Sequence, residues 1–187
     1  VKERSETGKR LAEELIAAYE SGELQDVFGP FFGDKIDVGT CLIFASNLKD
    51  VISRYDFRDC DLTSTELLSI FYYTYSKYSK INSDLRDNNS GPIKPIIQKI
   101  ESGLSKLKPE VGLVRRGAEL PPSEYARQAN SDYIEYPAFT SASTDNGFVR
   151  TYRFEMYSLT GRYVAPLSRY TYEEEVLFPP GARFKVL

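Results

Sequence analysis

The pattern of apolar residues changes at Lys108-Pro109, and this change limits the possible folds more than any other feature. Upstream of it, apolar residues recur every three or four positions, which is typical of amphipathic helices. Downstream of it, short apolar or alternating runs are separated by turn residues, which is typical of strands. Helices followed by a run of strands predict an α+β fold, with the helices segregated from a mainly antiparallel sheet region.

Several helices are expected before the change of pattern. Apolar stripes mark three of them at residues 11–19, 67–85 and 93–107, and a further helix is expected over about 39–55. The helix over 67–85 is expected to be long and to begin at a capping box, because Thr63 and Glu66 stand three residues apart just before it. Residues 26–37 contain Gly29-Pro30 and Gly33, so they are expected to form a loop.

The second part of the chain is expected to form strands at residues 111–116, 137–143, 152–157, 162–165, 174–178 and 183–187. A chain of 187 residues has the length of one ordinary domain and can bury a core without metal or disulfide staples. We therefore predict a single domain over residues 1–187, mainly helical over 1–110 and mainly β over 111–187.

The chain contains no histidine. This excludes Ser-His-Asp and Cys-His hydrolase chemistry and every histidine-based metal site. Catalysis must therefore rest on carboxylates, hydroxyls, tyrosines, arginine or lysine. Cys41 and Cys60 can form at most one disulfide, and their spacing suggests no metal site, so two reduced core thiols are expected.

The formal net charge of -3 argues against a general affinity for nucleic-acid phosphates, which usually requires a basic surface. A protein or a small molecule is the favoured substrate. No apolar run approaches the roughly 18 residues that a membrane span needs. The N-terminal residues are polar and lead directly into a helical pattern, so no signal peptide is visible.

Two segments of the strand half carry groups suited to binding. In Val114-Arg115-Arg116-Gly117, an arginine fork can hold a diphosphate, and the glycine lets that phosphate approach the backbone. In the second segment, residues 139–143, strand alternation places the hydroxyls of Ser141 and Ser143 on one face with Phe139. Small hydroxyls of this kind can orient a neighbouring carboxylate. Taken alone, each segment is explained well by an ordinary strand with exposed charges or hydroxyls, so neither is sufficient by itself.

A third segment, residues 173–186, begins with three consecutive glutamates and continues into an apolar run and a Pro-Pro-Gly turn. In an extended chain Glu173 and Glu175 point to the same face, so two carboxylates are expected side by side at the mouth of a strand. Two carboxylates at this spacing raise each other's pKa, and a cationic partner is expected to stabilise their ionised forms.

Taken together and in this order, these segments resemble the mono-ADP-ribosyltransferase family, in its arginine–serine–glutamate branch of bacterial toxins and vertebrate ecto-transferases. The family pattern is an aromatic or aliphatic residue followed by Arg and often Gly, then Phe-x-Ser-Thr-Ser, then Glu-x-Glu-Val-Leu-x-Pro with a later Phe-x-Val. Here Ala142 replaces the middle threonine. Residues 75–86 also resemble a Tyr-x-x-Ile-Asn-x-x-Leu-Arg stretch of the family, so the resemblance covers about residues 70–187. The histidine-containing branch of the superfamily is excluded.

The resemblance implies a helical part on a two-sheet β core and an enzyme that transfers ADP-ribose from NAD to a protein arginine with release of nicotinamide. Arg116 would hold the NAD diphosphate together with Gly117, and Arg115 is the alternative if the register slips by one. Ser141 would orient Glu175. Glu175 would bind the 2'-hydroxyl of the nicotinamide ribose and stabilise the developing oxocarbenium ion, and Glu173 would align and deprotonate the acceptor guanidinium.

The resemblance also implies further contacts. Asn82 and Arg86 would bind NAD from a helix, and Phe148 and Arg150 would lie near nicotinamide. Tyr170 and Tyr172 would touch the protein substrate. No metal is expected, because nicotinamide is already a cationic leaving group.

Two alternatives stay open. An NAD glycohydrolase would use the same NAD site and let water capture the ribosyl cation. A non-catalytic binding module would keep the fold without turnover, although every expected polar residue is present. With two cysteines the chain resembles a bacterial effector or toxin domain more than a disulfide-stapled ecto-enzyme, so it is expected to be secreted or delivered into a target cell.

Overall fold

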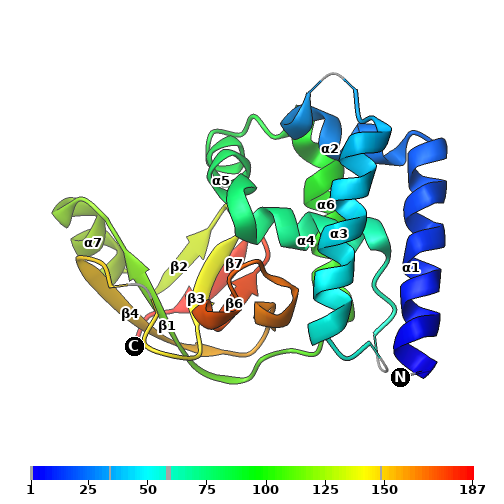
Figure 1. The fold of residues 1–187 in the computed structure, drawn as a ribbon. Helices are drawn as coiled ribbons and strands as arrows, with labels where there is room; N and C mark the ends of the chain where they lie inside the picture. Colours follow the sequence, from blue (N-terminus) through cyan, green and yellow to red (C-terminus); the bar gives the residue numbers. More distant parts are fainter. Residues whose placement is uncertain (1, 34, 58–59, 148) are drawn as a thin grey trace. The chain divides into compact units, whose positions relative to one another are not determined.

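The chain divides into two compact units, which are described separately. A computed structural model describes residues 2–33, 35–57, 60–147 and 149–187, with only the backbone given for residues 2–5. The helical unit comprises Val1–Leu107 and Pro166–Arg169, and the strand unit comprises Lys108–Ala165 and Tyr170–Leu187 (Figure 1). The division between them at Lys108 is where the sequence pattern changes.

Among the described residues, the first segment of the helical unit contains six α-helices and two short helical turns of other types, and a 3-10 turn, Ala165–Leu167, leads into its second segment. Their bounds are α1 Lys2–Glu20, α2 Glu23–Phe32, α3 Val38–Arg54, α4 Ser64–Tyr72, a π-helical turn Tyr73–Lys77, α5 Tyr78–Arg86, a 3-10 turn Gly91–Ile93 and α6 Lys94–Lys106. Among the described residues no helix is long and apolar enough to cross a membrane. Cys41 and Cys60 are free thiols, but both are half-buried rather than in the core.

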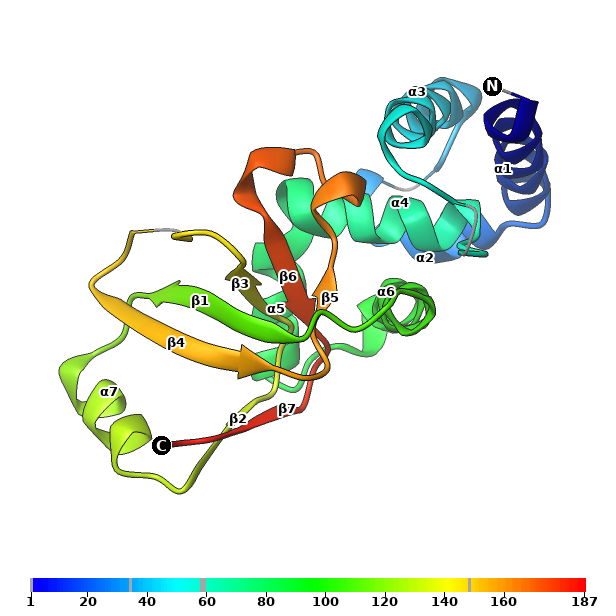
Figure 2. The same ribbon diagram turned by 90° about the horizontal axis from the view of Figure 1, so that it is seen from below.

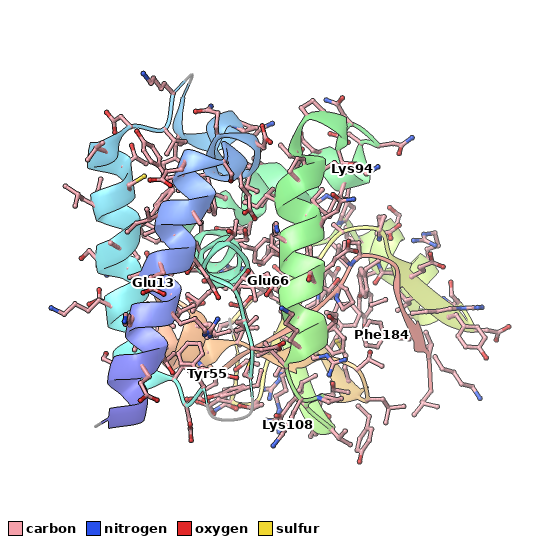
Figure 3. All side chains as sticks on the ribbon, turned by 90° about the vertical axis from the view of Figure 1, so that its right-hand side faces the viewer. Glu13, Tyr55, Glu66, Lys94, Lys108 and Phe184 are labelled. Atoms are coloured by element: carbon pink, nitrogen blue, oxygen red, sulfur yellow. The ribbon has the colours of Figure 1, made fainter. Side chains whose placement is uncertain are left out.

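Helix α4 is the centre of the helical unit. All of its residues are buried, and it contacts α1, α3 and α6 (Figure 1). Its start is the predicted capping box, in which the hydroxyl of Thr63 accepts from the Glu66 amide and the Glu66 carboxylate accepts from the Thr63 amide. Figure 3 looks along α4 and shows Glu66 between α4 and α6, where its carboxylate also accepts from Ser102 and pairs with Lys106.

The predicted loop over residues 26–37 was wrong, because most of it belongs to α2. Leu24, Val27 and Phe28 are buried, and Phe28 and Phe32 contact the rings of Phe44 and Tyr72. Burial of this aromatic cluster outweighs the helix-breaking effect of Pro30, which lacks the N–H for one backbone hydrogen bond of the helix. Gly33, with φ 107°, ends the helix in a conformation that favours glycine.

The predicted long helix from Thr63 to Leu85 is interrupted by the π-helical turn at Tyr73–Lys77. The extra residue in this turn rotates the following helix relative to α4. As a consequence Tyr75 and Tyr78, which the periodicity placed on the buried stripe, are 42% and 52% exposed, whereas Ile81 is buried.

The described residues of the strand unit form two antiparallel sheets. The larger has the order β4-β1-β3-β6-β5 and the smaller pairs β2 with β7 (Figure 2). The strands are β1 Gly112–Ala118, β2 Tyr133–Tyr136, β3 Thr140–Ser143, β4 Tyr152–Ser158, β5 Arg162–Tyr163, β6 Glu175–Phe178 and β7 Ala182–Lys185. The α+β class and the two antiparallel sheets are thus as predicted.

Two elements of the strand unit were not predicted, namely β2 and the helix α7 at Pro122–Ala129. Both lie in the polar stretch between the first two predicted strands. Helix α7 is held by Tyr125, whose ring stacks on Tyr152 of β4 with centroids 4.2 Å apart. The core between the sheets is a cluster of Val114, Ala142, Met156, Val176 and Phe178, against which Phe184 of β7 packs.

Candidate active site

The central feature of the site is the carboxylate of Glu175 at the start of β6. Glu175 is paired in register with Ser143 of the neighbouring strand β3, and Ser141 follows on the same face of that strand. The hydroxyl of Ser141 donates a hydrogen bond of 2.7 Å to Oε1 of Glu175. Glu175 is only 5% exposed, so this hydrogen bond fixes the orientation of a buried carboxylate.

The environment of Glu175 disfavours its charge. Burial raises the pKa of this carboxyl to about 7, the hydrogen bond from Ser141 opposes the shift, and the nearby charge of Glu173 adds to it. A carboxyl with a pKa near 7 is ionised in part at neutral pH, and an incoming cationic group would favour the ionised form. The site is therefore suited to receive positive charge.

Glu173 is close enough to influence Glu175, but not in the way that the sequence suggested. The prediction that the two acids project side by side from one extended strand was wrong. Glu173 ends a 3-10 turn, Thr171–Glu173, and Glu174 has the left-handed backbone angles φ 47° and ψ 43° before β6 begins. Burial raises the pKa of Glu173. The turn is tied to β3, because the hydroxyl of Ser143 donates to the Glu173 carbonyl at 2.9 Å.

The two arginines of β1 project to opposite faces, since they are neighbours in a strand. Arg115 is paired in register with Ser143, so it shares a row and a face with Glu175, and its Nε lies 3.5 Å from Glu155 of β4. Arg116 donates from Nη1 to the Ser141 carbonyl at 3.0 Å, and its guanidinium lies 5.5 Å from the ring of Tyr136. Both arginines thus adjoin β3, and Gly117 follows them in β1.

The remaining residues assigned by the resemblance lie elsewhere. Phe148 lies outside the described residues. Arg150 is exposed, with Nη1 3.3 Å from the Val149 carbonyl. Tyr170 precedes the turn that carries Glu173 and Tyr172 is its middle residue. Their ring centroids are 5.9 Å apart, and Tyr172 is 76% exposed.

Asn82 and Arg86 belong to α5 of the helical unit. The side-chain amide of Asn82 donates to the Tyr73 hydroxyl at 2.9 Å, and its Oδ1 is buried without a hydrogen-bond partner among the described residues. This acceptor is therefore available for a hydrogen bond from a bound water or ligand. Arg86 is exposed at the end of α5.

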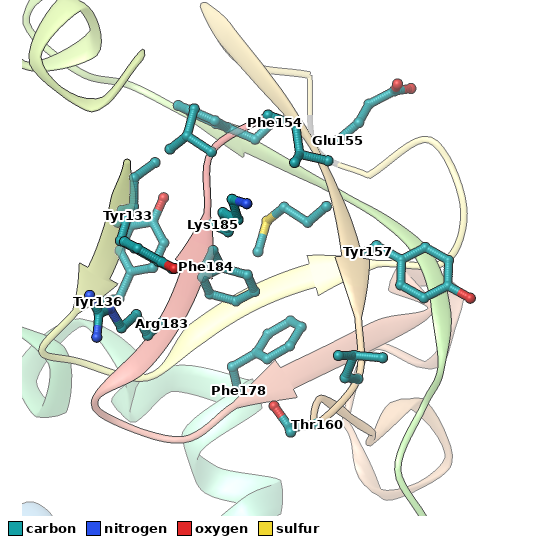
Figure 4. Close-up of a pocket in the computed structure, with 15 residues that line it drawn as sticks. Tyr133, Tyr136, Phe154, Glu155, Tyr157, Thr160, Phe178, Arg183, Phe184 and Lys185 are labelled. Carbon is teal, nitrogen blue, oxygen red and sulfur yellow. The ribbon is translucent and has the colours of Figure 1, made fainter. Parts of the chain in front are cut away.

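A cavity of about 610 Å³ lies between the two sheets of the strand unit (Figure 4). Its apolar lining includes Met156, Phe178 and Phe184, and the last two rings meet edge to face with centroids 5.0 Å apart. The register places Phe178 across from Thr140 and Glu175 across from Ser143, so the cavity side of the large sheet is opposite to the face of Glu175. The cavity is therefore separate from the candidate active site.

The sequence interpretation overlooked one contact near the site. The hydroxyl of Tyr163 on β5 donates to the carboxylate of Glu174, the middle residue of the three glutamates. No sequence motif marks this pair, because Tyr163 lies on a strand of two residues and its partner is eleven positions away. Among the described residues there is also no group of three or more Cys, Asp or Glu side chains that could hold a metal ion.

A two-sheet antiparallel unit with a serine-held glutamate at a strand end is the arrangement that the sequence resemblance implies for a mono-ADP-ribosyltransferase. Residues 47–187 match the family model for the ADP-ribosyltransferase exoenzymes. The chain therefore belongs to the ADP-ribosyltransferase exoenzyme family.

Two relatives are similar over 67% of this chain. Mav of Mycobacterium avium (strain 104), whose name assigns it NAD(+)–arginine ADP-ribosyltransferase activity provisionally, is 32% identical over 133 residues. The NAD(+)–protein-arginine ADP-ribosyltransferase Tre1 of Serratia proteamaculans (strain 568) is 28% identical over 131 residues. The matched parts span only 16% and 29% of these two proteins.

The fold is also that of a solved structure. The type III effector XopAI from Xanthomonas axonopodis pv. citri, crystallised without its first 70 residues, superposes with a TM-score of 0.67 at 17% identity. The superposition covers 98% of this chain and 88% of that chain. The α+β fold of this family therefore applies to the chain.

Proposed function

We propose that this chain transfers ADP-ribose from NAD to an arginine side chain of a target protein and releases nicotinamide. The observation that carries the proposal is the buried Glu175 carboxylate, held by the Ser141 hydroxyl at 2.7 Å. The names of Mav and Tre1, which both specify arginine, support the choice of acceptor. The order of the Arg, Ser and Glu-x-Glu segments supports membership of the arginine–serine–glutamate branch.

Glu175 acts on the first half of the reaction. The bond between the ribose C1' and the nicotinamide nitrogen breaks, nicotinamide takes the electron pair, and positive charge develops on the ribose. The ionised Glu175 accepts a hydrogen bond from the ribose 2'-hydroxyl and stabilises this charge more in the transition state than in bound NAD. Ser141 keeps the carboxylate in one orientation, so little reorganisation is needed.

Glu173 acts on the second half. A guanidinium nitrogen of the acceptor attacks C1', and its proton passes to Glu173. A free arginine holds its proton too tightly to attack, so a carboxylate beside it is required. Burial raises the pKa of Glu173, which makes it a better proton acceptor than an exposed glutamate.

Further NAD contacts are assigned by resemblance. Arg116 and Gly117 hold the diphosphate, with Arg115 as the alternative, and Asn82, Arg86, Phe148 and Arg150 complete the set. The buried, unpartnered Oδ1 of Asn82 supports its part in this set. The target protein is contacted by Tyr170 and Tyr172.

We further infer that residues 1–187 form one catalytic domain, since the family match begins within the helical unit and continues to Leu187. Delivery into a target cell as a secreted bacterial effector or toxin is supported by the similarity of the fold to a type III effector.

The test is incubation with NAD labelled in the ADP-ribose part, together with agmatine as an arginine mimic. We expect labelled agmatine and free nicotinamide, and we expect Glu175→Gln to fold normally and lose both products. The loss in rate should be about 100-fold or more, as is typical when one group that stabilises transition-state charge is removed. Release of nicotinamide without labelled agmatine would favour the glycohydrolase, and no release at all would favour the binding module.

A further inference from the structure

The middle glutamate of the three has an unusual backbone conformation. Glu174 has φ 47° and ψ 43°, and the only other described residue besides glycine with a positive φ is Asn88. A glutamate in this region is less favourable than a glycine or an asparagine by about 1 kcal/mol or more. The surrounding structure must therefore hold Glu174 in place, and this conformation gives the chain the bend that separates Glu173 from β6.

The side chain of Glu174 is anchored on the face of the sheet opposite to Glu175. Its carboxylate accepts a hydrogen bond from the hydroxyl of Tyr163, which packs against the core cluster between the sheets. Burial, followed by the Glu174 carboxylate, raises the pKa of Tyr163 to about 12. The hydroxyl therefore keeps its proton and remains a donor throughout the neutral range. A hydrogen bond from a hydroxyl to an ionised acceptor is among the stronger types.

The backbone of the same turn is tied to β3. The Ser143 hydroxyl donates to the Glu173 carbonyl at 2.9 Å, and the Thr144 amide donates to the Glu174 carbonyl at 3.1 Å. These contacts fix the main chain on one side, and the Tyr163 hydroxyl fixes the Glu174 side chain on the other. Together they leave Glu173 as the half-buried acid at the end of the 3-10 turn.

Glu175 is held by different contacts. It lies in β6, which pairs with both β3 and β5, and its carboxylate accepts from Ser141. Loss of the Tyr163 hydroxyl therefore affects the turn that carries Glu173 and leaves the hydrogen bond to Glu175 in place.

We propose that Tyr163 and Glu174 form a positioning pair that holds Glu173 where it serves the arginine acceptor. The inference rests on the proposed transferase function. In this proposal the two residues act through the conformation of the turn, and not through contact with NAD or the acceptor. The pair thus determines how the ribosyl cation is partitioned between arginine and water, whereas Glu175 determines how fast NAD is cleaved.

The test compares two activities in one set of variants. Tyr163→Phe keeps the packing of the ring and removes the donor, and Glu174→Ala removes the acceptor. We expect each to lower kcat/KM for agmatine about tenfold, in line with the loss of a hydrogen bond to a charged group, while NAD hydrolysis stays within about twofold of wild type. The double variant should be no worse than either single variant, because both changes break the same contact.

Two further variants separate positioning from stability. Glu174→Gln keeps an acceptor for Tyr163, so most of the agmatine transfer should return. Glu174→Gly adopts the left-handed conformation without steric cost but lacks the carboxylate that accepts from Tyr163. It should therefore melt at or above the temperature of Glu174→Ala and still transfer little ADP-ribose to agmatine. The melting temperature of every variant is measured alongside.

The outcomes are distinct. A selective loss of transfer in Tyr163→Phe and Glu174→Ala supports the pair. A loss of transfer and hydrolysis in equal proportion, or unchanged transfer, overturns it, and full transfer by Glu174→Gly does so as well. The assay of the wild-type protein alone tests the proposed function, which fails if that protein does not cleave NAD. The variants test the positioning pair.

Discussion

At the scale of single residues, the proposed activity depends on the ionisation of Glu175. Its pKa of about 7 results from burial, with a smaller opposing effect of the Ser141 hydrogen bond and a further rise from Glu173. The ionised form is the one that stabilises a ribosyl cation. Activity should therefore rise as pH increases toward 7 and level off above it, since kcat/KM reports the ionisation of the free enzyme.

Ser141→Ala should move this pH profile. The hydrogen bond from the serine hydroxyl stabilises the ionised form of Glu175, so its loss raises the pKa of Glu175 further. The rise in kcat/KM for NAD hydrolysis should therefore shift to higher pH. Ser143→Ala is the matched control, because the Ser143 hydroxyl donates to the Glu173 carbonyl and not to Glu175. A Ser141→Ala profile identical to that of wild type would contradict the assigned role of Ser141.

The two arginines of β1 need a direct comparison. Arg116→Lys should weaken NAD binding about tenfold or more, because a lysine cannot reproduce the two-pronged contact with a diphosphate. Arg115→Lys is the matched variant, and titration of NAD against both proteins identifies the binding residue. If Arg115→Lys alone binds NAD more weakly, then Arg115, which lies on the same face as Glu175, holds the diphosphate. The arginine motif of the family would then begin one residue earlier than assigned.

At the scale of elements, the contact between α4 and α6 depends on one buried acid. Burial raises the pKa of Glu66, but the hydrogen bonds from Ser102 and Thr63 and the contact with Lys106 together outweigh it, so the pKa lies below its ordinary value. A carboxyl with a lowered pKa stabilises the folded state above the pKa of the unfolded chain, and this stabilisation is lost as pH falls through the lowered value.

Glu66→Gln should accordingly lower the free energy of unfolding at neutral pH by about 2 kcal/mol, the usual value of hydrogen bonds to a charged group. The difference from wild type should shrink in acid, as followed by urea denaturation at several pH values. Glu13→Gln is a suitable control, because the pair of Glu13 with Lys9 is long, at 3.8 Å, and exposed, so its loss should cost little. Equal effects of the two variants would contradict a structural role for Glu66.

Elements with strong periodicity could be predicted from the sequence, and elements defined by tertiary contacts could not. The stripe from Ile93 to Leu107 is buried as predicted, and the Thr63 capping box forms. Helix α2 was missed because Pro30 and its neighbouring glycines indicate a loop, whereas the aromatic cluster around Phe28 favours a helix. The short strand β2 depends on its pairing with β7, which no local pattern reveals.

The same difference applies to the candidate site. Ser141 and Glu175 adjoin each other because two strands pair in one register, and the sequence could suggest this only through its resemblance to a family with that register. The left-handed conformation of Glu174 and its anchor on Tyr163 have no counterpart in the sequence pattern. For this reason the extended-strand interpretation of Glu173 was wrong, although Glu173 does raise the pKa of Glu175 as expected.

At the scale of the whole molecule, the chain combines a helical unit and a strand unit in one family fold. In the proposed mechanism Glu175 promotes the cleavage of NAD, and Glu173 enables an arginine to capture the resulting ribosyl cation. Water needs no carboxylate to attack the ribosyl cation, whereas a guanidinium does. Substitution of Glu173 should therefore affect transfer to arginine more than NAD hydrolysis, whereas substitution of Glu175 should affect both.

The most direct test is the ratio of agmatine ADP-ribosylation to NAD hydrolysis in Glu173→Gln, measured with the same labelled NAD and compared with wild type. We predict that transfer to agmatine is abolished while substantial NAD hydrolysis remains. Equal loss of both activities would mean that Glu173 takes part in NAD cleavage itself. Intact transfer would contradict the account, because the acceptor would then not depend on the carboxylate that the arginine chemistry requires.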